Sequence, residues 1–537
     1  MQKVLTAKEM REVDRLTTEK YGIPSIILME NAAHAASGII TGKFHGSVNG
    51  KSVLILCGKG NNGGDGAALA RVLWQAGAIV SLYLFAKLEE TKGDAHTNFQ
   101  TVASLSKTGE ILFEDDVPID DRFGNAEFDV SKFDLIVDAV FGTGLTGSLD
   151  SIYSDFCGLH SLRKDNDGPI FVSLDIPSGL NSNRPKPTGI NFQSDLTVTF
   201  TAAKPANVLP PASNYNGELY IANIGSPKEL VDNSHSKTFL AESQDAQSWL
   251  QSTQFSSDSY KSKRGNALLV VGSKKYTGAA VLAGNGAIQS GVGLVTVITP
   301  ESASSAVAER VLPEVMVNAS LETENGSIDV RAFGLINKLG EKADVIAIGS
   351  GLGSEEESTR NLVSKVVENR QTPVIIDADG LNSLSPVDLK GSEDHPLILT
   401  PHVGEFLKLI GIEDKEAIAN RVLAVRDFAE KHSVILVLKG ARTLIAGPDG
   451  KVVINPTGNS GLGKAGNGDN LTGIITGFVA QAVQMNVGVF ETVVAAVYIA
   501  GLAGDIAEKK FGKRTMLASD VRDCLVKAFA EVEKTDE

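Results

Sequence analysis

Short apolar runs alternate with helix-forming stretches along the whole chain. In the first half, apolar and β-branched runs lie at residues 52–57, 78–85, 135–140, 170–174, 196–200 and 218–224. In the second half, similar runs lie at residues 267–271, 293–298, 345–348, 373–376, 397–399 and 434–438. Such alternation is typical of a parallel sheet that helices cover on both faces. The pattern therefore predicts an α/β protein, with a Rossmann-like doubly wound sheet in its N-terminal half.

Capping and turn residues predict where several helices and loops begin. Thr6 and Glu9 form a capping box before a first helix that ends near Gly22, and a second helix follows Pro24. Two glycine-rich loops each precede a predicted helix: residues 58–66 before 67–75, and residues 458–468 before 471–483. Residues 443–446 and 451–454 are predicted to form a hairpin across a Gly-Pro-Asp-Gly turn.

The chain has 537 residues, more than one hydrophobic core usually serves. Residues 228–262 differ from their surroundings because they are rich in Ser, Asp and Gln and poor in strong apolar runs. We interpret this stretch as the connection between two domains together with the start of the second. The predicted domains are residues 1–227 and residues 240–535.

Charge and composition exclude several classes of function. The formal charge of −15 argues against sequence-independent binding of nucleic acid, which needs clustered lysines and arginines. The three cysteines, Cys57, Cys157 and Cys524, form no C-x-x-C pair, which indicates a reducing compartment and neither disulfides nor a thiolate metal site. The first residues lack the apolar segment of a signal peptide, and the most apolar late stretch, residues 493–503, is too short to span a bilayer. We expect a cytoplasmic homo-oligomer with small-molecule substrates and no nucleic-acid or membrane partner.

Three polar features follow strands of the first half. The loop at residues 58–66 contains two asparagines, whose carbonyl oxygens suit a monovalent cation or a sugar hydroxyl. Its glycines permit positive φ and close backbone approach, although such a loop alone is more often only a tight turn. Asp138 falls within an apolar run, where an unpaired carboxylate is costly, and alone it is as easily a loop cap as a ligand. Asp175 ends a strand before a rigid turn, and because ligands bind beyond the carboxyl ends of such strands, we expect one shared crevice.

These motifs resemble the NAD(P)H-hydrate epimerase family of YjeF N-terminal domains. The matching runs occur in family order over residues 1–227, at residues 28–32 (LMENA), 61–66 (NNGGDG), 138–145 (DAVFGTGL), 175–180 (DIPSGL) and 199–205 (TFTAAKP). The resemblance implies interconversion of the R and S hydrates, which are epimers at C6 of the reduced nicotinamide ring. It also implies a potassium ion near Asn62, Asp138 and Ser178.

Epimerisation at C6 requires the hydroxyl to leave and return, or the ring to open, and both routes need a positioned proton carrier. Asp175 is our candidate for this role, while Lys204 could contact phosphate, orient Asp175 or be solvated. The resemblance implies that one larger set of residues contacts the substrate: Asn61, Asn62, Gly63, Gly64, Asp65, Gly142, Thr143, Gly144, Leu145, Thr146, Gly147, Ser148 and Asp175.

The strongest single motif of the second half is the glycine-rich run at residues 455–470, which contains Asp469 and leads into an apolar helix. Backbone N–H groups at residues 466–469, assisted by the helix dipole, suit developing phosphoryl charge. An aspartate there is placed to take a proton from a hydroxyl that attacks phosphorus. The alternative is that Asp469 only caps the helix, which is a common use of Asp. The run lacks the Gly-Lys-Ser/Thr ending of a Walker loop.

Other predicted strand ends support a nucleotide site. Residues 439–443 provide a cation, a flexible glycine and a hydroxyl. His402 follows another strand, although a lone histidine is more often structural. Asp377 and Asp379 follow a buried strand and suit Mg²⁺ or substrate. Two further loops allow close approach of a ligand to the backbone: residues 349–353 and 276–280.

Over residues 240–535 this ensemble resembles the ADP/ATP-dependent NAD(P)H-hydrate dehydratases, a branch of the ribokinase-like fold. The resemblance implies that ADP, or ATP, phosphorylates the ring hydroxyl of the S hydrate, and that loss of phosphate restores NAD(P)H. Bacterial members with both domains joined typically use ADP. The resemblance implies hydrate binding by Ala279, Gly353, His402 and Asp469. It implies nucleotide binding by Lys439, Gly440, Ala441, Arg442, Thr443 and Gly468.

The sequence departs from this family's pattern at three places. Residues 260–265 (YKSKRG) stand where the family often has His-Lys-Gly, and Ser350 replaces a usual proline before Gly-Leu-Gly. The loop that enters the catalytic helix has Lys464, Asn467 and Asn470 at unusual positions. These departures affect the choice of nucleotide and the rate more than the reaction class.

Two rival functions belong to other classes. Ribokinase-like domains mostly phosphorylate alcohols and keep the product, so the second half could be a small-molecule kinase. The first half could bind a nucleotide without turnover, because N-terminal domains of this type also occur in eukaryotic scaffold proteins. Incubation with hydrated NADH and ADP separates a dehydratase, which restores the reduced nicotinamide, from a kinase, which yields a stable phosphorylated alcohol.

Overall fold

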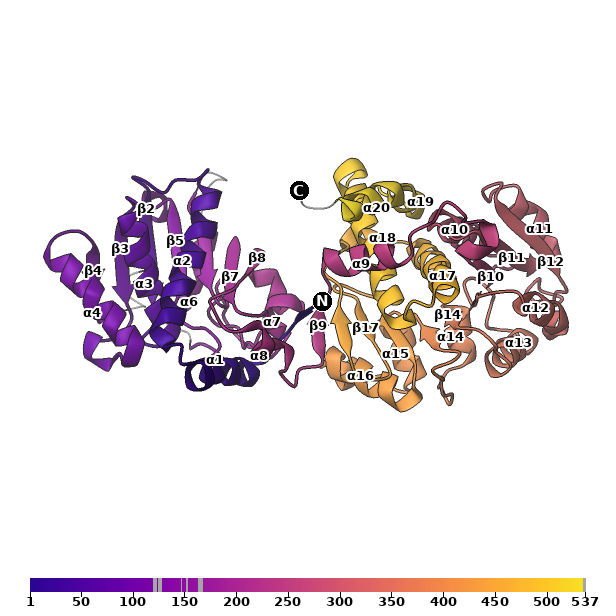
Figure 1. Cartoon of the computed structure of the whole chain (residues 1–537), viewed down its shortest axis with the longest axis horizontal. Helices are drawn as coiled ribbons and strands as arrows, with labels where there is room; N and C mark the ends of the chain where they lie inside the picture. Colours follow the sequence, from indigo (N-terminus) through magenta and orange to yellow (C-terminus); the bar gives the residue numbers. More distant parts are fainter. Residues whose placement is uncertain (119–122, 124–127, 146, 151–152, 163–167, 535–537) are drawn as a thin grey trace. The chain divides into compact units, whose positions relative to one another are not determined.

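The structure, a computed structural model, describes residues 1–118, 123, 128–145, 147–150, 153–162 and 168–534 (Figure 1). It divides into two compact units, Lys3–Ser236 and a second unit that combines Met1–Gln2 with Lys237–Glu537. Each unit has its own sheet and its own buried apolar clusters. The chain is therefore an α/β protein of two domains, as the alternation of strands and helices predicts.

The N-terminal unit is built on a seven-stranded parallel sheet in the order β4-β3-β2-β5-β6-β7-β8. Its strands are β2 (Ser52–Cys57), β3 (Ile79–Leu84), β4 (Leu112–Glu114), β5 (Leu135–Ala139), β6 (Ile170–Leu174), β7 (Leu196–Phe200) and β8 (Glu218–Ala222). Its helices are α1 (Ala7–Tyr21), α2 (Ser25–Lys43), α3 (Asn61–Gln75), α4 (Gly93–Lys107), α6 (Ser154–Gly158), α7 (Pro205–Val208) and α8 (Lys228–Asp232). The strand order reverses between β2 and β5, which puts a crevice at the carboxyl ends of these strands.

The first glycine-rich loop is shorter than the sequence predicts, because α3 begins at Asn61 and not at residue 67. Gly63, Gly64 and Gly66 lie inside the helix, and none of the five glycines at residues 58–66 has a positive φ. A β-carbon on Gly63 would lie 1.7 Å from the Gly58 carbonyl oxygen, and one on Gly66 would lie 2.8 Å from Cys57 Sγ. The expected close approach is therefore present, but it is between the helix and β2. The expected left-handed backbone is absent from these glycines.

The C-terminal unit contains an eleven-stranded sheet in the order β1-β9-β18-β17-β16-β15-β14-β13-β10-β11-β12. Its strands are β1 (Gln2–Lys3), β9 (Thr238–Leu240), β10 (Asn266–Val270), β11 (Leu294–Pro300), β12 (Val315–Ser320), β13 (Val345–Ile348), β14 (Val374–Ile376), β15 (Leu397–Leu399), β16 (Ile435–Leu438), β17 (Leu444–Ala446) and β18 (Val452–Ile454). The strands from β12 to β16 are parallel, and the predicted hairpin β17–β18 continues the sheet in antiparallel pairing.

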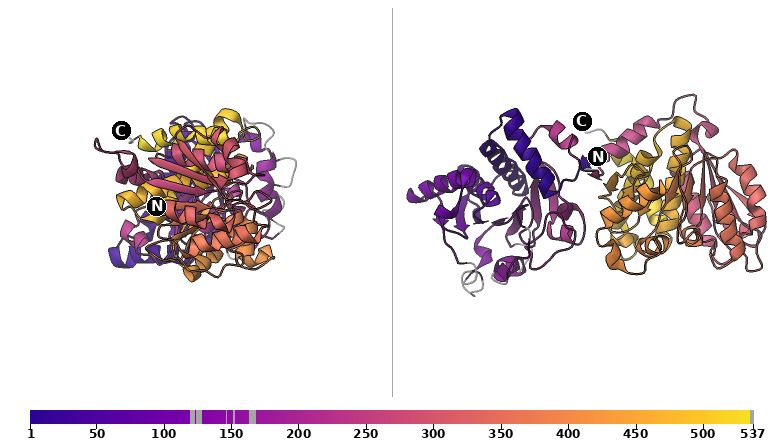
Figure 2. Two further views of the ribbon diagram at one scale, coloured as in Figure 1. Left: turned by 90° about the vertical axis from the view of Figure 1, so that its right-hand side faces the viewer. Right: turned by 90° about the horizontal axis from the view of Figure 1, so that it is seen from below.

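Helices lie on both faces of this sheet, as the side view in Figure 2 shows. They are α9 (Ser243–Ser252), α10 (Thr277–Gln289), α11 (Glu301–Ala308), α12 (Phe333–Gly340), α13 (Glu357–Glu368), α14 (Asp379–Ser383), α15 (Val403–Leu409), α16 (Arg421–His432), α17 (Asn467–Met485), α18 (Val489–Phe511), α19 (Ala518–Asp523) and α20 (Leu525–Glu533). The catalytic-helix candidate α17 begins four residues before the predicted start at 471, so Asp469 lies in its first turn.

The apolar helix α18 is longer than the stretch at residues 493–503 on which the sequence analysis relied. By length and composition alone its 23 residues could cross a membrane, but 61% of the most apolar window is buried inside the protein. It packs against α9, α17 and α20, and its buried side chains belong to the main apolar cluster of the C-terminal unit. These are the properties of a core helix.

Candidate active sites

Asp138 is the centre of a hydrogen-bond network at the end of β5. Its buried carboxylate accepts from the hydroxyls of Ser173 (2.8 Å) and Ser178 (2.6 Å), and from the N–H groups of Ser178 (2.8 Å) and Val140 (3.2 Å). Burial nevertheless raises the pKa of Asp138 to about 6. Because both of its oxygens are bonded within the protein, Asp138 fixes the turn that follows β6 against the end of β5.

Asp175 and Lys204 form an ion pair at the same edge of the sheet. Lys204 Nζ lies 2.6 Å from Asp175 Oδ1 and also donates to Thr199 Oγ1 (2.9 Å) and the Phe200 carbonyl (3.0 Å). Because Lys204 is only 1% exposed, it orients Asp175 and is not a solvated lysine. Asp175 Oδ2 accepts the N–H of Thr143 (3.2 Å), and Asp175 itself has a φ of 63°. Such strain in a non-glycine residue concentrates at functional sites.

Asn62 carries two buried side-chain atoms, Oδ1 and Nδ2, that have no hydrogen-bond partner within the described residues. They lie beside Gly142, where a β-carbon would be 3.2 Å from Asn62 Oδ1 and 3.1 Å from Asp175 Oδ2. A buried amide oxygen that lacks a donor calls for a ligand or ion. Asn62 therefore fits the predicted potassium site, whereas Ser178 and Asp138 already bond each other at 2.6 Å.

The other residues predicted to contact the first substrate lie around this edge. Residues 61–65 form the start of α3, and residues 142–145 follow β5. Gly144 and Gly147 face open space, because a β-carbon on either would meet no atom within 4 Å. Asn61 and Ser148 are exposed at the rim, and Thr146 lies outside the described residues. The structure thus gathers Asn62, Gly142, Thr143 and Asp175 most closely.

Asp14 is a residue of this region that the sequence analysis missed. It follows the buried Val13 on α1, and its Oδ1 is buried without a partner among the described residues. Burial raises the pKa of Asp14 to about 6; Lys204 opposes this rise and Asp175 adds to it. Burial, and then Asp175, also raise the pKa of Asp65. The available signal was a carboxylate next to the apolar face of an amphipathic helix.

In the C-terminal unit, Asp377 joins four segments at the carboxyl ends of the strands. Its Oδ1 accepts from Lys439 Nζ (2.6 Å) and the Thr400 hydroxyl (2.8 Å), and its Oδ2 from the hydroxyls of Thr472 (2.8 Å) and Ser350 (3.3 Å). Burial opposes ionisation, yet Lys439 and the hydroxyls hold the pKa of Asp377 below its usual value. In turn, against the effect of burial, Asp377 raises the pKa of Lys439. This pair is therefore charged, and it organises the site.

Asp469 lies in the first turn of α17 and is half-buried. The residue that precedes the helix is Gly466, with a φ of 92°, and no side chain caps this helix end. The alternative that Asp469 is an ordinary helix cap is therefore wrong. Burial, and then Asp377, raise the pKa of Asp469 to about 6, while Lys439 acts in the opposite direction. A β-carbon on Gly468 would lie 3.5 Å from Lys439 Nζ, so a cation stands beside the helix start.

The unusual residues just before and in the first turn of α17 have structural roles. Lys464 Nζ donates to the Met516 carbonyl (2.9 Å), and Asn467 Nδ2 donates to the Leu462 carbonyl (3.0 Å). Asn470 is 2% exposed and lies where α17 packs against α10. These departures from the family pattern hold the loop in place and leave the start of α17 intact.

The other residues predicted to bind the hydrate lie on three loops. Ala279 is in the first turn of α10 and faces Gly351, whose β-carbon position is 2.8 Å from Ala279 Cβ. The N–H of Gly353 donates to Asp379 Oδ2 (2.9 Å). The Nδ1 atom of His402 accepts a backbone N–H (3.1 Å) and caps α15, yet the side chain is 61% exposed. His402 thus has the structural role considered for it and an accessible ring.

The residues predicted to bind the nucleotide include the partly buried Lys439 and the turn that follows it, residues 440–443. The side chain of Lys439 is 20% exposed. Gly440, Ala441 and Arg442 are exposed on the turn between β16 and β17, and the Thr443 hydroxyl donates to the Gly440 carbonyl (3.2 Å). The turn therefore offers accessible backbone and a guanidinium, and Lys439 offers a fixed charge.

Protein ligands for a divalent metal are sparse. Across the part of the chain that the structure describes, no group of three or more His, Cys, Asp or Glu side chains is placed to hold a metal ion. The oxygens of Asp377 are taken by four hydrogen bonds, and Asp379 accepts from Gly353 and Ser354. These two carboxylates are thus already hydrogen-bonded within the protein, and a Mg²⁺ ion beside them stays a prediction. The three cysteines are free and buried.

Comparisons with known proteins match both halves of the chain. The family model described as NAD(P)H-hydrate dehydratase matches residues 267–527, and the model described as YjeF-related protein N-terminus matches residues 25–206. A "Bifunctional NAD(P)H-hydrate repair enzyme" of Moorella thermoacetica is 37% identical over 99% of this chain and 97% of its own. A protein of the same name from Thermofilum pendens is 34% identical over 98% and 96%. The solved ADP/ATP-dependent NAD(P)H-hydrate dehydratase from Bacillus subtilis is 30% identical, with 55% of this chain and 99% of that chain covered and a TM-score of 0.47.

Proposed function

The chain belongs to the family of bifunctional NAD(P)H-hydrate repair enzymes, and from this premise we propose how its residues divide the work. The unit that holds Asp175 interconverts the R and S hydrates of NADH or NADPH. The unit that holds Asp469 dehydrates the S hydrate with ADP or ATP and regenerates NAD(P)H. We assign the first activity to residues 1–227 and the second to residues 240–535.

The dehydratase assignment depends on one observation: Asp469 lies in the first turn of α17 near Lys439, and Asp377 accepts a hydrogen bond from that lysine at 2.6 Å. With a pKa of about 6, Asp469 is ionised at neutral pH and still basic enough to take a proton from the ring hydroxyl. As the hydroxyl oxygen bonds to the terminal phosphorus of the nucleotide, the helix N–H groups and Lys439 face the developing charge.

The second half of this reaction needs little further help from the protein. The ring nitrogen's electron pair expels phosphate from C6, and loss of a proton from C5 forms the C5=C6 double bond of NAD(P)H. ADP leaves as AMP, or ATP leaves as ADP. We propose that the nucleotide lies along Lys439, Gly440, Ala441, Arg442, Thr443 and Gly468, and that His402, Ala279 and Gly353 position the hydrate. Mg²⁺ would arrive on the nucleotide's phosphates, because such ions use few protein ligands in nucleotide sites.

The epimerase assignment depends on the buried pair of Asp175 and Lys204. The C6 hydroxyl leaves as water while the ring nitrogen forms a double bond to C6, and water then adds to the opposite face. We propose that Asp175 carries the proton that this exchange requires, and that Lys204 keeps its carboxylate aimed at the crevice. A potassium ion held at Asn62, with Asp138 and Ser178 behind it, would supply positive charge to the substrate's phosphates.

We also propose that the protein is cytoplasmic, because its free, buried cysteines suit a reducing compartment. The proposed partners are the hydrates and the nucleotide, and a homo-oligomer stays a prediction.

The proposed dehydration is tested by mixing the full-length protein with the S hydrate of NADH and either ADP or ATP. We expect the absorbance of the reduced nicotinamide to return together with stoichiometric release of AMP, or ADP, and phosphate. A phosphorylated alcohol that accumulates without return of this absorbance would instead identify a small-molecule kinase.

A further inference from the structure

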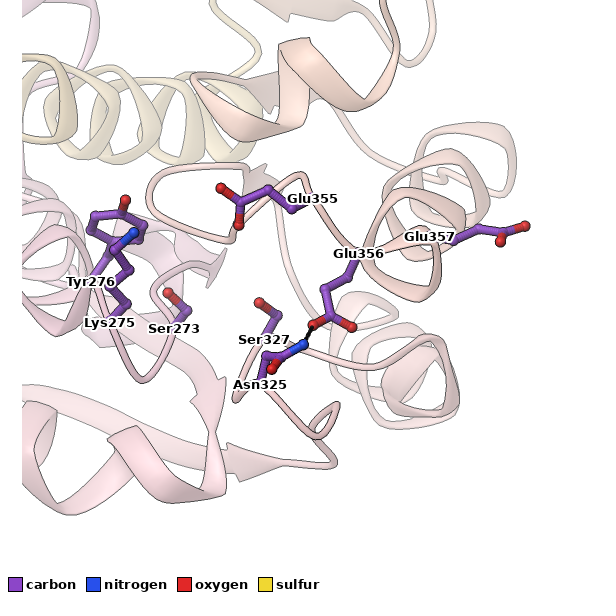
Figure 3. A pocket seen from close by; sticks show the side chains of 9 residues that line it. Ser273, Lys275, Tyr276, Asn325, Ser327, Glu355, Glu356 and Glu357 are labelled. Atoms are coloured by element: carbon purple, nitrogen blue, oxygen red, sulfur yellow. Dashed lines mark hydrogen bonds between the residues drawn. The ribbon is translucent and has the colours of Figure 1, made fainter.

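The C-terminal unit has a pocket of about 440 Å³ that opens beside Gly353. It lies between the loop after β10, with Ser273 and Tyr276, and the loop after β13, with Gly353 and Glu355 (Figure 3). We call it the Gly353 pocket. Its volume is in the range of small-molecule sites. The two loops are joined by a hydrogen bond from the Gly272 N–H to the Ser350 carbonyl (2.8 Å).

The Gly353 pocket lies near the candidate catalytic centre. Ser350, three residues before Gly353, donates to Asp377 at 3.3 Å. Three residues of chain span about 10 Å at most, so the pocket begins within that distance of the Asp377 network. A dinucleotide whose nicotinamide ring reaches Asp469 has a second half that must lie elsewhere on the surface.

Ser273 gives the pocket a buried hydroxyl that could bind a polar ligand. This residue is 3% exposed and lines the pocket, yet its hydroxyl has no hydrogen-bond partner within the described residues. A buried hydroxyl without a partner is costly unless a ligand or water satisfies it. Ser327 and Asn325 add further hydroxyl and amide groups to the lining. These are partners for sugar hydroxyls or a base amine.

The charge of the pocket is unsuited to a phosphate. Three glutamates, Glu355, Glu356 and Glu357, and a single cation, Lys275, are among its lining residues. Figure 3 shows the Glu355 carboxylate pointing toward the side of the pocket that Ser273 and Tyr276 line, Glu356 bonded to Asn325, and Glu357 pointing away from these residues. A dianionic phosphate here would meet a net negative field.

We propose that the Gly353 pocket takes an uncharged, hydroxyl-bearing part of the hydrated dinucleotide, and that Glu355 makes the dehydratase favour the NADH hydrate over the NADPH hydrate. The two hydrates differ by one phosphate on the adenosine ribose. Placing that ribose in the pocket puts its hydroxyls near Ser273 and Ser327 and its added phosphate near Glu355. This specificity rests on the proposed dehydratase function.

The test compares kcat/KM of the full-length enzyme for the S hydrates of NADH and NADPH, at low salt and with saturating ADP. We expect the wild type to prefer the NADH hydrate, and Glu355→Gln to reduce that preference by about three- to tenfold because one repulsive charge is removed. Added salt should reduce the wild-type preference in the same direction. Glu368→Gln, the same change at an exposed residue at the C-terminal end of α13 that does not line the pocket, is the matched control and should leave the ratio unchanged.

Ser273→Ala provides a second measurement that does not depend on charge. It should raise KM for both hydrates by about two- to tenfold, the worth of one hydrogen bond, and leave their ratio unaltered. A wild-type preference for the NADPH hydrate, an unchanged ratio in Glu355→Gln, or an unchanged KM in Ser273→Ala would overturn the proposal while leaving the dehydratase function in place. Failure of the wild type to dehydrate either hydrate would instead overturn the proposed function and this inference with it.

Discussion

Lys439 Nζ lies 2.6 Å from Asp377 Oδ1, and the pair stands at the carboxyl ends of β14 and β16. The same nitrogen lies 3.5 Å from the β-carbon position of Gly468, at the start of α17. A buried carboxylate thus holds a cation next to the helix turn that carries Asp469. Burial and the negative charge of Asp377 outweigh that cation, so the pKa of Asp469 rises. The site therefore has one fixed anion and one carboxylate that can exchange a proton.

Replacing the fixed anion should destabilise the C-terminal unit. Asp377→Asn removes the carboxylate that lies 2.6 Å from the largely buried Lys439, and we expect a loss of about 3–5 kcal/mol in the free energy of unfolding, measured with urea. Dehydration should fall at least tenfold, while epimerisation should persist. Asp258→Asn breaks the exposed pair with Lys263 (2.7 Å) and should change neither property. Equal effects of the two substitutions would contradict the organising role of Asp377.

The dehydration rate should depend on the protonation of Asp469. Because its pKa is about 6, we expect kcat/KM for the S hydrate to fall about tenfold per pH unit below pH 6 and to be flat just above 7. Asp469→Asn should remove dehydration at every pH. A full-rate Asn variant, or a profile without this acid limb, would refute the assignment of Asp469 as the base.

The same raised pKa predicts how Asp469 affects stability. The folded protein holds the proton more tightly than an unfolded chain with a pKa of 3.8 does. The proton on Asp469 therefore contributes its full share to the free energy of unfolding below about pH 4, and this contribution is lost as pH rises through about 6. At pH 7, Asp469→Asn should be more stable than the wild type by about 1–2 kcal/mol. A destabilised variant in urea titrations at that pH would be evidence against a desolvated carboxylate.

Epimerisation should require both members of the buried pair in the N-terminal unit. Asp175→Ala should abolish exchange of the R and S hydrates and leave dehydration of the S hydrate intact. Lys204→Met should also slow exchange by about 10²-fold or more, since Asp175 loses the donor at 2.6 Å that orients it. Chromatography of the two hydrates measures exchange directly. Unchanged exchange in Asp175→Ala would show that another group carries the proton.

The glycines at the start of α3 should be needed for packing. Gly63→Ala places a methyl group 1.7 Å from the Gly58 carbonyl oxygen, so the helix start must move away from β2 and epimerisation should be lost. Gly60→Ala meets no atom within 4 Å and is the control in the same loop. Thermal unfolding of both variants checks that the domain persists. A fully active Gly63→Ala protein would show that this close approach is dispensable.

The sequence predicted strands best where they are buried and β-branched. The strands Ile170–Leu174, Leu196–Phe200 and Val345–Ile348 lie at the predicted residues. The strands that were missed, β1, β4, β9 and β12, are short or partly exposed and lack a continuous apolar run. The apolar pattern of the sequence therefore predicted those strands that are buried on both faces of the sheet. It failed for strands that are defined by pairing with a neighbouring strand.

The sequence predicted the motifs of both sites, but not the hydrogen bonds and ion pairs that connect their residues. Family resemblance singled out Asp175 and Asp469, whereas the partners that set their properties come from distant positions. Thr472 reaches Asp377 from 95 residues away, and Lys204 reaches Asp175 from 29. Asp14 and the pocket around Ser273 were missed, because nothing in a single sequence shows that a buried polar atom lacks a partner.

The central claim is that one chain both epimerises and dehydrates the hydrates of NADH. Its most direct test is to give the full-length enzyme an equimolar mixture of the R and S hydrates with excess ADP, and to follow return of the reduced nicotinamide. The account predicts rapid conversion of the whole mixture, with one AMP and one phosphate per NADH, and rapid conversion of only the S half by Asp175→Ala. Accumulation of a phosphorylated hydrate, or no loss of either hydrate, would contradict it.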